Sequence, residues 1–105
     1  SQEGFEKYGA NAAESAFMIL DSSLVRSRPR CRYLGIPATT EAKNTLGREI
    51  VANIVMLGAL VRATGIVREE SLEKAILDSV PKGTESLNVR AMKRGMELAS
   101  GEKAQ

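Results

Sequence analysis

The sequence REIVANIVMLGALVRATG (residues 48–65) contains the longest nearly apolar run of the chain, Ile50 to Val61. It predicts a helix from about Arg48 to Thr64, with Gly65 as its stop signal. Because apolar residues surround this helix on nearly all sides, we expect it to lie in the middle of the protein as its most buried element. The apolar run is about a dozen residues, shorter than the roughly 20 that a membrane span needs.

Two residues within this helix call for an explanation. We expect Asn53 to be a buried structural amide that bonds a backbone carbonyl, because most buried polar side chains bond to backbone. The alternative role for Asn53 is a contact with a ligand or a partner subunit. Glycine inside a helix costs about 1 kcal/mol relative to alanine, so we expect Gly58 to be buried where another backbone packs closely.

Two further helices follow. Residues 69–79 predict an amphipathic helix, which Pro81-Lys82-Gly83 ends, and Thr84 is the expected cap of the last helix. The first of these helices has one apolar face, formed by Leu72, Ala75, Ile76 and Val80. The apolar residues of the last helix that are expected to face inward are Leu87, Ala91 and Leu98. Its outward-facing charged residues are expected to be Arg90, Lys93, Arg94 and Glu97.

The upstream half predicts two strands. Phe17 to Leu20 is a short apolar run typical of a buried parallel strand, and Tyr33 to Ile36 is a second one, which Pro37 ends. Thr39 or Thr40 is the expected cap of a short helix through Lys43. The fold class is therefore α/β: the C-terminal part of a Rossmann-like three-layer domain, two short strands followed by about three helices.

Composition excludes several kinds of site. The 105 residues include 43% hydrophobic and 27% charged residues, no histidine, and Cys31 as the only cysteine. An internal disulfide, a zinc site of Cys and His, a four-thiolate cluster and a Ser-His-Asp triad are all impossible within this chain. We therefore expect no catalytic and no metal-binding residue here. The lone thiol fits a reducing compartment, and we expect a cytoplasmic protein.

Alternate arginines form the most distinctive charged segment. Arg26, Arg28, Arg30 and Arg32 would project to one side if the segment were extended. They are candidates for contact with an anion, such as a coenzyme A phosphate, or with an acidic partner subunit. The competing interpretation, which we favour, is a solvated loop. Cys31 beside two arginines is either a reactive thiol or, more commonly, an incidental one.

Several segments in order resemble one protein family. The segment from Asn44 to Leu60 resembles a signature of the gamma subunits of 2-oxoacid:ferredoxin oxidoreductases, which have a Gly, then an Asn, then Met-Leu-Gly-Ala-Leu. Other matching segments are Gln2 to Phe5, Leu20 to Val25, Ile36 to Thr39, Ser71 to Ile76 and Leu87 to Gly95. The family's first strand and its Gly-x-Gly-Gly-Gln-Gly turn have no counterpart in the sequence. Residues 1–105 therefore resemble the C-terminal portion of a single gamma-type domain.

The resemblance implies a function. The family's complexes oxidatively decarboxylate a 2-oxoacid to an acyl-coenzyme A while reducing ferredoxin. The resemblance does not distinguish between pyruvate and 2-oxoglutarate as the 2-oxoacid. Thiamine diphosphate and iron–sulfur clusters belong to the other subunits, so this chain is expected to be a non-catalytic module and inactive alone. The implied partners are alpha and beta subunits, with a delta subunit as a further candidate.

A different class of function competes with this one. It is a stand-alone helical interaction or nucleic-acid-binding module that uses Arg26 to Arg32. The net charge of +2, the absence of Trp and the apolar main helix argue against nucleic acid. We expect instead a homo- or hetero-oligomer that associates across the open strand edge near Phe17 to Leu20.

Overall fold

Two short parallel strands form the start of the fold. The computed structural model describes residues 17–25 and 30–101. Strand β1 (Phe17–Asp21) pairs with β2 (Arg32–Ile36) in a register that sets Phe17 opposite Arg32 and Asp21 opposite Ile36. Both predicted strands and their parallel pairing are confirmed.

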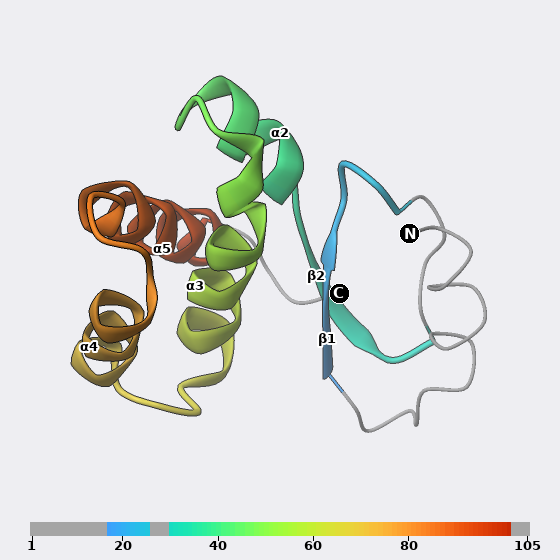
Figure 1. The fold of residues 1–105 in the computed structure, drawn as a ribbon. Helices are drawn as coiled ribbons and strands as arrows, with labels where there is room; N and C mark the ends of the chain where they lie inside the picture. Colours follow the sequence, from blue (N-terminus) through green and yellow to red (C-terminus); the bar gives the residue numbers. More distant parts are fainter. Residues whose placement is uncertain (1–16, 26–29, 102–105) are drawn as a thin grey trace.

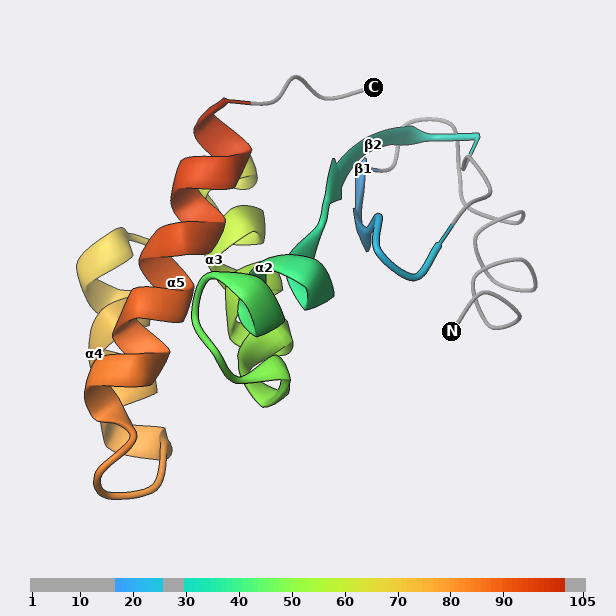
Figure 2. The same cartoon turned by 90° about the horizontal axis from the view of Figure 1, so that it is seen from above.

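Four helices follow the strands in the described part of the chain. They are α2 (Ala38–Asn44), α3 (Ala52–Thr64), α4 (Glu69–Ser79) and α5 (Glu85–Ser100), and a 3₁₀ turn η1 (Glu49–Val51) precedes α3. All of them lie on one side of the strand pair (Figures 1 and 2). The α/β class is confirmed, although the sequence led us to expect about three helices.

The helix boundaries follow from local chemistry. Gly65 ends α3 with φ 63°, a left-handed conformation that glycine adopts readily. The predicted cap of the short helix is wrong, because Pro37 rather than Thr39 or Thr40 is the N-cap residue of α2. Thr84 is confirmed as the N-cap residue of α5, although its side chain makes no capping hydrogen bond. The Thr84 hydroxyl instead donates to the Pro81 carbonyl at 2.6 Å within the preceding turn.

Helices α3 and α5 pack more closely than any other pair of elements in residues 17–25 and 30–101. A Cβ atom on Gly58 would collide with the carbonyl oxygen of Met92, and a Cβ on Gly95 would collide with the carbonyl oxygen of Val55. Each helix therefore supplies a glycine at the point where the other helix's backbone passes. Gly58 is buried, and the missing side chains at both positions allow the two backbones to approach closely.

The core has two parts that meet at this crossing. One part lies between the strands and α2, α3 and α5, with Ile36 and Val55 wholly buried. The other lies between α3, α4 and α5, where Leu72 and Ile76 of α4 pack on Met92 and Met96. Helix α5 thus contacts both parts and holds α4 to the rest of the fold.

Candidate functional site

One side of α3 is left open by the described residues. Ile50 is 78% exposed, Leu57 is 37% exposed, Asn53 is exposed and Leu60 is half-buried. Spacings of three and four residues place these side chains along one side of a helix. We call Asn53, Leu57 and Leu60 of α3, together with Ile50 of the preceding turn η1, the outer face of α3.

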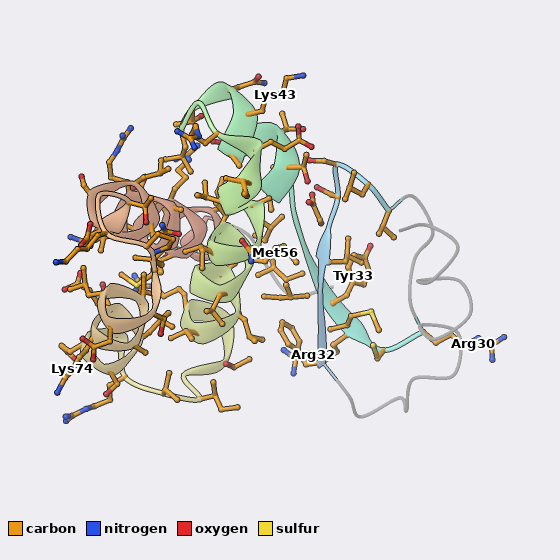
Figure 3. The ribbon with its side chains drawn as sticks, in the orientation of Figure 1. Arg30, Arg32, Tyr33, Lys43, Met56 and Lys74 are labelled. Atoms are coloured by element: carbon orange, nitrogen blue, oxygen red, sulfur yellow. The ribbon has the colours of Figure 1, made fainter. Side chains whose placement is uncertain are left out.

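Two hollows flank this outer face, and Asn53 lines both. One, of about 350 Å³, lies toward the strands and includes Ile19 and Met56. Figure 3 shows Met56 between α3 and the strand pair. The other, of about 390 Å³, lies toward the α4–α5 connection and includes Asn88. Both asparagines belong to the segments that carry the family resemblance, and the fold brings them to one groove.

The expectation that α3 is contacted on several sides holds where it faces α5 and the strands, but the expectation that Asn53 is buried is wrong. Only the side of α3 that faces α5 and the strands is covered, with Val55 and Ala59 fully buried. The two-stranded sheet is too narrow to cover the other side. An amide in this position is accessible to another polypeptide or a ligand, which was the alternative role for Asn53.

A polar cluster lies at the carboxyl ends of the strands. Asp21 accepts hydrogen bonds from the backbone and hydroxyl of Thr39 at 3.0 and 2.6 Å and from the backbone of Ser23 at 3.0 Å. Its carboxylate thus satisfies the free N–H group of Thr39 at the start of α2, where a negative charge is favourable. The sequence signal for this cap is an acidic residue at the end of a strand. The cluster is structural, since its carboxylate oxygens already accept three bonds.

One ion pair joins α2 to α5. Arg94 donates to Glu41 at 2.9 Å and to Glu97 at 3.2 Å, and the Thr45 hydroxyl donates to Glu41 at 2.7 Å. The hydrogen bond from Arg94, and then that from Thr45, lowers the pKa of Glu41. The same bond to Glu41 raises the pKa of Arg94. Arg94 is half-buried rather than on the outer surface, because it reaches back to α2.

Only two members of the arginine row, Arg30 and Arg32, lie among the described residues, and the structure separates them. Arg26 and Arg28 lie outside the described residues. Strand β2 begins only at Arg32, so the extended geometry that would align alternate side chains does not reach Arg30. Figure 3 shows Arg30 and Arg32 directed to opposite sides of the strand pair, with Arg32 on the helix side.

The described residues contain little that could hold a metal. Among residues 17–25 and 30–101, no three His, Cys, Asp or Glu side chains come together as a metal site. Cys31 is buried, at 5% exposure. None of the helices in these ranges is long and apolar enough to cross a membrane.

Comparison with known proteins places this architecture in a family. Residues 1–98 match the family model described as pyruvate ferredoxin/flavodoxin oxidoreductase. The chain is 46% identical over 103 residues to the 2-oxoglutarate synthase subunit KorC of Methanocaldococcus jannaschii, a match that covers 94% of this chain and 55% of that relative. It is 40% identical over 62 residues to the pyruvate/ketoisovalerate oxidoreductases common subunit gamma of Pyrococcus abyssi, covering 59% of this chain and 33% of the relative.

A solved structure has the same fold. The gamma subunit of a keto/oxoacid ferredoxin oxidoreductase from Geobacter sulfurreducens superimposes with a TM-score of 0.88 at 41% identity, covering 96% of this chain and 61% of that one. The match to the Methanocaldococcus relative spans little more than half of that relative's length. The family match over residues 1–98 and the shared fold together establish that this chain belongs to the pyruvate ferredoxin/flavodoxin oxidoreductase family.

Proposed function

We propose that this chain is a non-catalytic portion of the gamma subunit of a 2-oxoacid:ferredoxin oxidoreductase. The complex would oxidatively decarboxylate a 2-oxoacid to an acyl-coenzyme A and reduce ferredoxin. The observation that carries the proposal is the family match over residues 1–98, together with the 0.88 TM-score to a gamma subunit. The alternative, a stand-alone nucleic-acid module, has no comparable support.

The chemistry of the chain agrees with a non-catalytic role. With no histidine and one cysteine, it lacks the thiolates that a four-cysteine iron–sulfur cluster needs. Thiamine diphosphate and iron–sulfur clusters are assigned to the other subunits, and coenzyme A is assigned to the complex as a whole. Those subunits are the proposed partners, alpha and beta in the first place, and the cytoplasm is the proposed location.

We assign the outer face of α3 and the open edge of β1 to association. A parallel sheet is normally covered on both faces and rarely stops at two strands. Strand β1 has a partner on one side only in the described sheet, and the hollow beside Ile19 runs from this strand to Leu57 and Leu60. The proposed occupant is a further parallel strand beside β1, from the part of the gamma-type domain that this chain does not span in its relatives.

A reconstitution experiment tests the catalytic assignment. The purified chain is supplied with thiamine diphosphate, coenzyme A, ferredoxin, and either pyruvate or 2-oxoglutarate, with and without the alpha and beta subunits. We expect no reduction of ferredoxin by the chain alone, and binding of the chain to the other subunits. Ferredoxin reduction by the chain alone, or its failure to bind any of those subunits, would contradict the proposal.

A further inference from the structure

A basic hollow lies at the end of the sheet where both strands begin. Phe17 and Arg32 open β1 and β2 there, and Arg62 and Thr64 come from the last turn of α3. The hollow has a volume of about 520 Å³. Figure 3 shows Arg32 directed toward this side, away from Arg30. Arg32 and Arg62, which share the hollow, are 30 residues apart in the sequence, and Arg62 does not belong to the arginine row.

Both guanidinium groups are held in place by protein contacts. The Arg62 Nε donates to the hydroxyl of Ser100 at 2.8 Å, and that hydroxyl donates to the Met96 carbonyl at 2.8 Å. The Arg32 guanidinium lies 5.7 Å from the centre of the Phe17 ring, within the range of a cation–π contact. Such restraint reduces the side-chain entropy that an arginine loses when it binds an anion.

The charge in the hollow is positive on balance. The C-terminal ends of α3 and α5 meet there, and each carries about half a negative elementary charge. Two guanidinium groups outweigh this, and no carboxylate of the described residues lies within 4.0 Å of a nitrogen of Arg32 or Arg62. Glu69 and Glu97 line an adjoining hollow, which shares Arg62 and Ser100 with this one and also includes Lys93. Glu97 is bonded to Arg94.

The floor of the hollow is apolar. Leu34 is 2% exposed and Ala99 is 8% exposed, and both line it. An apolar floor accepts an apolar stem, while arginine binds a carboxylate through two parallel hydrogen bonds. We propose that this hollow receives a carboxylate on an apolar stem, supplied by a partner polypeptide as an acidic side chain or a C-terminus. The choice of a polypeptide rests on the proposed role as a complex subunit.

Nuclear magnetic resonance of arginine side chains tests the site on the 105-residue chain itself. The Nε–Hε signals of ¹⁵N-labelled protein are followed during titration with N-acetyl-leucine, a carboxylate on an apolar stem. We expect saturable shifts at Arg32 and Arg62, and none with N-acetyl-leucine amide, which lacks the charge. Equal shifts with the amide, or tighter binding of inorganic phosphate than of N-acetyl-leucine, would overturn the assignment.

Matched variants locate the site. Arg32→Gln and Arg62→Gln should each weaken N-acetyl-leucine binding at least tenfold, and Arg90→Gln, an exposed arginine on α5 outside the hollow, should leave it unchanged. Arg32→Lys keeps the charge without the fork and should give an intermediate loss. Unchanged binding in Arg62→Gln would refute the proposal. The titration needs no other subunit, so its failure and a failure of reconstitution are distinguishable.

Discussion

The two sides of α3 have similar apolar character and opposite environments. The inner side meets α5 through Gly58 and Gly95, and its Val55 and Ala59 are fully buried. The outer face carries larger side chains, and Ile50 is 78% exposed. Small residues therefore line the side of α3 that packs against α5 of the same chain. Large apolar residues mark the side that the described residues leave uncovered, which is typical of an interaction surface.

The largest expected effect comes from removing volume on the inner side. Met92 of α5 is wholly buried between α3 and α4. Met92→Ala should lower the free energy of unfolding by about 2–5 kcal/mol, since it loses buried apolar contacts and leaves a cavity. Urea denaturation measures this. Leu57→Ala on the outer face is the control, and an equal loss there would break the distinction between the two sides.

Adding a methyl group at the helix crossing should have the next largest effect. In an exposed helix interior, Gly→Ala stabilises by about 1 kcal/mol. Gly95→Ala should instead destabilise by roughly 1–3 kcal/mol, because the new Cβ meets the Val55 backbone. Gly101→Ala is the matched control, since its Cβ would find only contacts of 3.9 Å or longer. A Gly95→Ala protein as stable as wild type would mean that the two backbones are not in close contact.

A smaller, pH-dependent effect comes from the ion pair between α2 and α5. The folded pKa of Glu41 is lowered from 4.5, so its contribution to stability is complete above that pH and is lost as the pH falls through the lowered value. Glu41→Gln should cost about 1 kcal/mol at pH 7 and nothing below the folded pKa. The free energy of unfolding of the wild-type and Glu41→Gln proteins, measured from pH 7 to pH 2, gives this difference.

The control for this pair is the exposed contact between Lys93 and Glu73, whose charged atoms are 4.0 Å apart. Glu73→Gln should change stability negligibly at any pH, because exposed pairs are screened by solvent. A Glu41→Gln difference that persists undiminished at pH 2 would contradict the assigned role of Arg94.

The smallest effect on stability is expected on the outer face of α3. Ile50→Ser and Leu57→Ser should each change the free energy of unfolding by no more than about 0.5 kcal/mol, as is usual for exposed positions. The same substitutions should weaken association with the part of a gamma-type domain that this chain does not span, measured by co-purification. Outer-face variants that unfold but still associate would reverse the roles assigned to the two sides.

Much of the fold could be predicted from local patterns. The bounds of α4, residues 69–79, follow from its amphipathic spacing and the proline that follows, and the strands follow from short apolar runs. The contacts between distant residues could not be predicted. The carboxylate of Asp21 caps a helix that begins 17 residues later, and Arg94 bonds Glu41 across 53 positions. No local pattern records such partners.

The outer face was mispredicted for a related reason. An apolar run around a helix predicts burial, and it does not say whether the covering groups belong to the same chain. Here Asn53 and Leu57 are uncovered by the described residues. Likewise, alternate arginines suggested one charged row, whereas the start of β2 at Arg32 separates that residue from Arg30.

Sedimentation velocity tests the central claim, that the outer face of α3 and the edge of β1 receive the rest of a gamma-type domain. The chain is mixed at micromolar concentration with the segment of the Methanocaldococcus jannaschii KorC relative that lies outside the matched region. We expect the two to sediment together, and we expect a chain carrying Ile50→Glu and Leu57→Glu, with unchanged far-ultraviolet circular dichroism, to sediment alone. Separate sedimentation of the wild-type chain and the segment, or a complex unaffected by both substitutions, would contradict the claim.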